Sequence, residues 1–298
     1  LKKLDSILES GREVLHLDRL SIFRADPQER WLQATVTTGT EEPLENIRVP
    51  LGPEGGGLAE AYLTKQLIVG DGVTPLPEKL RLQPGDRLLD VGCGWGGMVR
   101  YAARHGVKTI GVTLSREQAA WAQKAIAEEG LADLAEVRHS DYRDVRESGF
   151  DAVSSIGLTE HIGVANYPSY FRFLHSKLRT GGLLLNHCIT RPDNRAGPTA
   201  GGFIDRYVFP DGELTGSGRI IAEAQDVGLE VVHEENLRHH YAMTLRDWCR
   251  NLVEHWDEAV EEVGLATAKV WGLYMAGSRL GFETNVVQLH QVLAVKLD

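Results

Sequence analysis

The run L-L-D-V-G-C-G-W-G-G, residues 88–97, constrains this chain more than any other feature. A short apolar stretch ends in Asp90 and passes at once into closely spaced glycines, which predicts a buried strand that turns tightly into a helix. Glycine has no Cβ, so its backbone can approach a ligand closely. We therefore expect a ligand where this strand ends; a tight turn that holds no ligand is the alternative.

The spacing of the glycines distinguishes between folds that use such a turn. No Gly-Lys-Ser/Thr follows that could hold a triphosphate, and Gly97 comes one position too early for G-x-G-x-x-G. An acidic residue followed by G-x-G-x-G instead resembles the first motif of S-adenosylmethionine (SAM) methyltransferases. Asp90, Gly92, Gly94 and Gly96 are therefore candidate cofactor-binding residues.

Composition excludes several other classes of protein. The 42% hydrophobic and 25% charged content is that of an ordinary soluble protein. No apolar run of about 18 residues occurs, and the first residues do not resemble a signal peptide, so we expect a cytoplasmic protein. The 3 cysteines form no C-x-x-C pair and no histidines have metal-ligand spacing, so no metal site is expected. A net charge of −10 disfavours nucleic acid as a partner.

Residues 1–75 are expected to form a separate segment. Apolar patterning predicts helices over 4–15 and 58–64 and strands over 20–23, 31–37 and 47–52. This order, with L-D-R-L-S-I-F-R-A-D-P and G-G-G-L-A-E-A-Y, resembles the first half of a GAF domain, a small sensory or dimerising module; a structural cap is the alternative. Because the later strands of that fold are absent, we expect a break in the backbone near residues 70–75.

Strands alternate with helices in residues 76–298. We expect strands over 79–82, 87–91, 109–114, 135–138, 152–156 and 183–187, the last after a Gly181-Gly182 turn, and helices over 98–105, 116–129 and 167–178. Such alternation predicts an α/β fold with a parallel sheet covered on both faces. Ligands of these sheets bind beyond the carboxyl ends of the strands.

Two of these strands are followed by candidate cofactor contacts. Thr113 and Leu114 end one strand in T-L-S-R-E-Q, with Gln118 one helical turn later; a helix-capping box would also explain this pattern. In H-S-D-Y-R-D, Asp141 is placed to accept a hydrogen bond from an adenine amine and Tyr142 to cover a ring face. A solvated turn is the alternative there.

Ionisable residues follow the next two strands. Glu160 in I-G-L-T-E-H-I-G opens a helix, where a carboxylate is often only a partner for free amides. His187 in N-H-C-I-T ends the following strand, and a lone histidine there is more often structural than catalytic. Two ionisable groups at neighbouring strand ends, both facing the cofactor crevice, favour a catalytic site.

Together these stretches resemble the cyclopropane-fatty-acyl-phospholipid synthase family, which includes the mycolic acid cyclopropane synthases. The match runs from about Leu82 to the last residue and includes E-H-I-G, N-Y-P-S-Y-F, Y-V-F-P-D-G-E-L and L-R-H-H-Y-A-M-T-L-R-D-W. The resemblance implies a Rossmann-like, seven-stranded SAM-methyltransferase sheet and a lipid-binding insertion over about 190–265.

The resemblance also implies a reaction. A cis double bond of an unsaturated phospholipid acyl chain attacks the SAM methyl group, and the site must align the two and exclude water from the resulting cation. In the family a bound bicarbonate then removes a proton, held by groups that map to Glu160, His187, the Ile189 backbone and Tyr241. Which proton leaves decides between a cyclopropane and a methylene-branched product, and the sequence leaves this open.

Partners and location follow from the same resemblance. The substrate implies a protein peripheral at the inner face of the membrane; a homodimer is left open. The family's Y-S-C-like turn, whose cysteine backbone also contacts bicarbonate, is not found between Leu1 and Asp86. Either that lid is absent from these residues, which we favour, or the GAF-like segment has replaced it. A small-molecule methyltransferase and a ligand-sensing GAF-type module with a non-catalytic methyltransferase half are the alternative functions.

Two further segments carry apolar residues. Residues 191–215 predict a flap over the crevice; an ordinary surface loop is the alternative. Residues 245–263 predict an amphipathic helix whose apolar stripe is more often core than lipid channel. The flap residues expected to contact an acyl chain are Phe203, Ile204, Tyr207 and Phe209.

Overall fold

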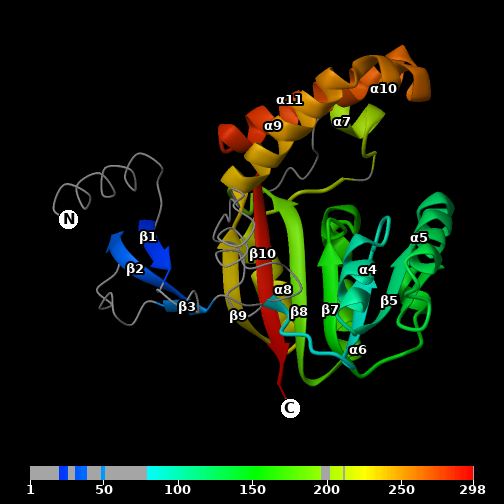
Figure 1. The fold of residues 1–298 in the computed structure, drawn as a ribbon. Helices are drawn as coiled ribbons and strands as arrows, with labels where there is room; N and C mark the ends of the chain where they lie inside the picture. Colours follow the sequence, from blue (N-terminus) through cyan, green and yellow to red (C-terminus); the bar gives the residue numbers. More distant parts are fainter. Residues whose placement is uncertain are drawn as a thin grey trace. The chain divides into compact units, whose positions relative to one another are not determined.

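The computed structural model (Figure 1) describes residues 20–25, 31–38, 48–50, 79–195, 202–210 and 212–297. The chain divides into two compact units, Leu1–Val73 and Thr74–Asp298. The break expected near residues 70–75 lies outside the described residues, as do the helices expected over 4–15 and 58–64.

The first unit contains a small antiparallel sheet in the order β1-β2-β3. Its strands, Leu20–Ala25 (β1), Trp31–Thr38 (β2) and Arg48–Pro50 (β3), fall where strands were expected. The likeness of this unit to a GAF domain stays a prediction.

The second unit is built on a seven-stranded sheet in the order β6-β5-β4-β7-β8-β10-β9. Five neighbouring strands are parallel, and β10 runs antiparallel to both β8 and β9. This confirms the predicted Rossmann-like α/β fold. The strands are Arg87–Val91 (β4), Lys108–Thr113 (β5), Ala135–His139 (β6), Phe150–Ile156 (β7), Leu178–Thr190 (β8), Leu229–Asn236 (β9) and Gln288–Lys296 (β10).

Helices cover both faces of this sheet. Adjacent side chains of a strand point to opposite faces, so Leu88 and Leu89 of β4 belong to different clusters. Leu89 lies in the cluster that contains Phe171, and Leu88 in the cluster that contains Ala102. An apolar run without alternation is therefore what this central strand requires. The covering helices are Gly97–Arg104 (α4), Arg116–Glu128 (α5), Tyr167–Lys177 (α6) and Ser217–Asp226 (α8).

Two local expectations are wrong. No strand forms over 79–82: Lys79 is helical, and a turn follows in which Leu80 alone is buried. The alternation of polar and apolar residues that predicted a strand fits this turn equally well. β8 begins at Leu178, ahead of the Gly181-Gly182 pair, which forms a bulge within the strand instead of a turn before it. Gly181 has a φ of +74°, a conformation that glycine adopts readily.

Helices also lie beyond the carboxyl ends of the parallel strands, at the top of Figure 1. They are Gly202–Tyr207 (α7), Arg238–Glu254 (α9), Trp256–Val263 (α10) and Leu265–Glu283 (α11). The amphipathic stretch 245–263 is thus split between two helices. The expectation that its stripe is core holds for Leu245, which is buried, but not for Trp248 and Val263, each 48% exposed. The reason is that α9 and α10 pack on α11 along only part of their surface.

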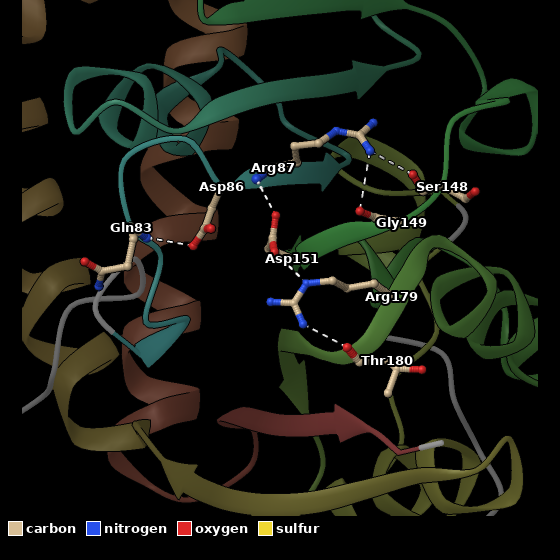
Figure 2. Close-up of polar contacts among 8 residues, drawn as sticks. All are labelled: Gln83, Asp86, Arg87, Ser148, Gly149, Asp151, Arg179 and Thr180. Atoms are coloured by element: carbon tan, nitrogen blue, oxygen red, sulfur yellow. Dashed lines mark hydrogen bonds and ion pairs between the residues drawn. The ribbon is translucent and has the colours of Figure 1, made fainter.

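At the opposite edge of the sheet, one carboxylate links three segments of the chain (Figure 2). Asp151 Oδ2 accepts a hydrogen bond of 2.8 Å from the Arg87 amide, and Oδ1 accepts one of 2.6 Å from Arg179 Nε. Burial alone would raise the pKa of Asp151, but the hydrogen bonds from Arg179 and Arg87 outweigh it and hold the pKa below the ordinary value. The starts of β4 and β7 and the bulge of β8 are thereby held together.

We expect Asp151→Asn to lower the free energy of unfolding by about 1 kcal/mol at neutral pH, because two hydrogen bonds lose their charged acceptor. Since the folded pKa is depressed, this contribution is present above the unfolded pKa and is lost as pH falls through the folded one. Urea unfolding at neutral pH and at about pH 3 measures the difference, with exposed Asp133→Asn as control. An equal loss at both pH values would contradict the charge-based explanation.

Candidate functional site

Two cavities adjoin each other at the carboxyl ends of the parallel strands. Their volumes are about 740 Å³ and 520 Å³, and His161 lines both. The larger lies against α7, α9 and α11, and the smaller lies beside the glycine-rich loop. This is the edge of the sheet at which the sequence predicts a ligand.

Most of the predicted cofactor-binding residues line the smaller cavity. They are Gly92, Gly94, Thr113, Leu114, Gln118, Asp141 and Tyr142. Gly94 has a φ of +52°, and a Cβ built on it would meet no atom within 4 Å. The backbone of the loop therefore borders open space, as close approach of a ligand requires.

Asp90 and Gly96 do not line this cavity. Asp90 is 2% exposed and accepts a hydrogen bond of 2.7 Å from Ser154 Oγ, and burial raises its pKa to about 6. Gly96 has a φ of +72°, and a Cβ there would lie 3.0 Å from Ala122 Cβ. These two residues shape the loop and let α4 approach α5.

The polar groups of the smaller cavity already have partners in the protein. Thr113 Oγ1 donates to Gln118 Oε1 at 2.7 Å, and the Gln118 amide donates to the capping Ser115 Oγ. Asp141 accepts hydrogen bonds from Arg143, which lower its pKa. The helix cap at Ser115 and the turn at Asp141, which are the alternative explanations of these two motifs, are therefore both formed. An adenine amine bound to Asp141 would share the carboxylate with Arg143.

The larger cavity is mainly apolar. Of the four flap residues, Phe203, Ile204 and Phe209 lie in its lining, whereas Tyr207 is outside it and 55% exposed. Further apolar lining comes from α11, from β10, from the link between them and from the segment before α8. These residues are Leu214, Phe282, Val286, Val287 and Leu289.

All four predicted catalytic residues line this larger cavity: Glu160, His187, Ile189 and Tyr241. Glu160 lies on a single 3-10 turn, Thr159–His161 (η4), directly after β7, and is 6% exposed. Its Oε1 accepts a hydrogen bond of 2.7 Å from the Ile189 amide. Its Oε2 is buried and has no hydrogen-bond partner among the described residues.

This environment changes the protonation of Glu160. Burial raises its pKa to about 7, although the Ile189 amide opposes the shift. A carboxylate with such a pKa can accept a proton near neutral pH and pass it on. The resemblance implies that the Ile189 amide contacts an anion. Because this amide already donates to Glu160, it would have to share its hydrogen between Glu160 and the anion.

Burial also shifts the pKa values of His187 and Tyr241. Burial, together with the charge of Lys79, lowers the pKa of His187 to about 4. Burial, with smaller effects of Tyr274 and Glu160, raises the pKa of Tyr241 to about 12. These shifts favour the neutral forms of His187 and Tyr241 near pH 7, beside a carboxylate whose pKa lies close to that pH.

Sequence reasoning missed Lys79 and Gln291. Gln291 Nε2 lies 3.0 Å from His187 Nδ1, and Lys79 Nζ donates to Gln291 Oε1 at 2.7 Å. Neither residue belongs to a motif that the resemblance provides. The one signal was the polar pair His290-Gln291 inside the otherwise apolar stretch L-H-Q-V-L-A-V.

Two searches of the described ranges gave negative results. No group of three or more His, Cys, Asp or Glu side chains there could hold a metal ion. None of the helices in those ranges has the length and apolar composition needed to cross a bilayer.

Comparison with known proteins identifies similar chains. The family model for mycolic acid cyclopropane synthetase matches residues 71–292. A probable fatty acid methyltransferase of Mycobacterium tuberculosis is 80% identical over 221 residues, which cover 74% of this chain and 52% of the relative. The cyclopropane-fatty-acyl-phospholipid synthase of Escherichia coli is 34% identical over 219 residues, covering 72% and 55%. The chain thus spans about half the length of these curated relatives.

A solved structure agrees with these relatives. Mycolic acid cyclopropane synthase CmaA1, complexed with SAH and CTAB, superimposes with a TM-score of 0.68 at 30% identity. The superposition covers 74% of this chain and 81% of that one.

We expect Gly94→Val to weaken SAM binding by about a hundredfold or more, because the side chain would enter the smaller cavity (a loss of about 2.7 kcal/mol). Calorimetric titration measures it. Gly130→Val is the matched control, since Gly130 has a φ of +67° and open space around it but does not line the cavity. Unchanged SAM affinity in Gly94→Val would place the cofactor elsewhere.

Proposed function

Since this chain belongs to the mycolic acid cyclopropane synthetase family, we propose that it is a SAM-dependent C-methyltransferase of unsaturated phospholipid acyl chains. The product would be a cyclopropane or methylene-branched fatty acid. The observation that carries the proposal is the larger cavity, a mainly apolar space of about 740 Å³ that adjoins the cavity beside the glycine-rich loop and is lined by Glu160, His187 and Tyr241. An acyl chain has few polar groups and therefore suits such a lining.

The smaller cavity fits the cofactor. Its open loop at Gly94 and the aromatic ring of Tyr142, half-buried against Tyr170, offer a close backbone approach and a ring face for a nucleoside. When bound, SAM supplies the electrophilic methyl group. The shared wall at His161 puts the two cavities in contact, so the protein can hold methyl donor and acyl chain side by side.

The apolar lining disfavours water beside the acyl chain. Phe203, Ile204 and Phe209 line the larger cavity on the flap side, and Phe282 lines it from α11. A cation formed on the acyl chain would be captured by water in a polar site, so this lining favours the intended product. The acyl chain would be taken up at the membrane surface, which implies a cytoplasmic protein peripheral at the inner face; a homodimer stays open.

The polar side chains of the larger cavity fit a small anion that carries a hydroxyl group. Tyr241 can donate a hydrogen bond, the neutral His187 can donate one, and Glu160 Oε2 is a buried acceptor without a partner in the described chain. Bicarbonate has this combination of oxygens and a hydroxyl, and we include it in the proposal. Glu160, with its pKa raised to about 7, would receive the proton at Oε2.

The function is tested by mass spectrometry of membrane fatty acids from cells that express the protein. We expect monounsaturated chains to gain one methylene unit, and cells expressing Gly94→Val to show no gain, because that variant lacks its cofactor. An unchanged lipid profile with the wild type would overturn the proposal and favour a small-molecule methyltransferase or a ligand-sensing module.

We expect Glu160→Gln to lower turnover by about a hundredfold, the scale of general base catalysis, while SAM binding stays nearly intact. Added bicarbonate should not restore it. Because the pKa of Glu160 is raised to about 7 and Glu160 must be ionised to receive the proton from the anion, wild-type turnover should fall as pH drops below that value, and the variant should lack the inflection that is due to Glu160. The exposed Glu230→Gln is the control. Full turnover in Glu160→Gln would make Glu160 a structural residue.

A further inference from the structure

A row of polar side chains crosses three neighbouring strands beside the larger cavity. His187 of β8 is paired in register with Gln291 of β10, and Gln291 is paired with Glu235 of β9. Gln291 is 3% exposed, so its amide must be satisfied inside the protein. Lys79, whose side chain is 8% exposed, bonds both Gln291 and Glu235.

The hydrogen-bonding chemistry of Lys79 fixes the orientation of the Gln291 amide. An ammonium group has donors only, so the atom of Gln291 that lies 2.7 Å from Lys79 Nζ is the carbonyl oxygen. The NH₂ group therefore points the other way, toward His187 Nδ1 at 3.0 Å. An NH₂ group has no acceptor, so Nδ1 must accept this bond and carries no proton.

The surrounding charges agree with this assignment. Burial and the positive charge of Lys79 both disfavour a charged imidazole, and they lower the pKa of His187 to about 4. The other ionisable groups lining the cavity are Glu160, His161, Tyr241 and Tyr274. Glu235 is on the far side of Gln291, where it pairs with Lys79 instead of with the ring.

We propose that Gln291 and Lys79 are positioning residues that hold His187 as a neutral imidazole with its proton on Nε2. This inference deepens the proposed function and rests on it for its catalytic meaning. With Nδ1 bound to Gln291, the proton on Nε2 leaves the ring a donor toward an anion in the cavity. The opposite tautomer would turn a lone pair toward that anion and repel it.

The direct test is the ¹⁵N NMR spectrum of ring-labelled histidine in the full protein without cofactor or substrate. In the wild type we expect the Nε2–H tautomer of His187 and no protonation between about pH 6 and pH 8. Gln291→Glu replaces the NH₂ donor by an acceptor, so the proton should move to Nδ1 and the pKa of His187 should rise. A wild-type ring with its proton on Nδ1, or no change in Gln291→Glu, would overturn the inference.

Turnover gives a second readout that a purely structural role would not move. At about pH 8 we expect Gln291→Glu to lower kcat by about tenfold or more with little change in the KM for SAM. Imidazolium carries protons on both nitrogens, so the ratio of variant to wild-type kcat should rise as pH falls through the raised pKa. Exposed Gln225→Glu carries the same charge change as the control. A ratio that is constant with pH would contradict the role.

Lys79→Met keeps the test decisive if Gln291→Glu does not fold. Without the ammonium group the Gln291 amide can flip, so both tautomers of His187 should be detected and its pKa should rise. A single Nε2–H tautomer with an unchanged pKa would show that Lys79 does not orient Gln291. Because the spectra need no substrate, they separate the two proposals: a wild type that does not methylate lipid refutes the function, and a wrong tautomer refutes only this inference.

Discussion

The site depends on the burial of one carboxylate between two neighbouring strand ends. Glu160 follows β7 and accepts a hydrogen bond of 2.7 Å from the Ile189 amide near the end of β8, so the carboxylate links the two strand ends. An ionised carboxylate with an unpartnered buried oxygen is costly, and the cost appears as a pKa raised to about 7. The protein retains at this point a group that fold stability alone would not select.

The parallel sheet explains why so few contacts are needed to assemble the site. Strands β4, β5, β7 and β8 all end at one edge, so the loops after them meet without long connections. The loops after β4 and β5 border the smaller cavity, and those after β7 and β8 border the larger one. His161 follows Glu160 and contributes to both, which places the proposed methyl donor against the proposed acceptor.

The fold and much of the site could be predicted from the sequence, for physical reasons that also explain the failures. Period and turn chemistry are local, so the buried strand at Leu88–Val91 and the glycine-rich turn after it were recognisable from a few residues. Partners set by register between distant strands are not local. Nothing near Gln291 indicates that β10 would pair it with His187, and the alternation at 79–82 fits a turn as well as a strand. The exposure of Trp248 likewise depends on how α9 packs on α11.

The position of Lys79 shows how charge can act on the cavity without entering it. Lys79 Nζ reaches Gln291 but does not line the cavity, and its charge is paired with Glu235. A neutral amide therefore separates the cation from His187. It transmits a hydrogen-bond direction, in addition to the effect of the Lys79 charge on the pKa of the ring. A cation placed directly against the ring would have to be desolvated in an apolar cavity, at a cost of several kcal/mol. Gln291 thus allows a mainly apolar chamber to contain an oriented donor without a cation directly against the ring.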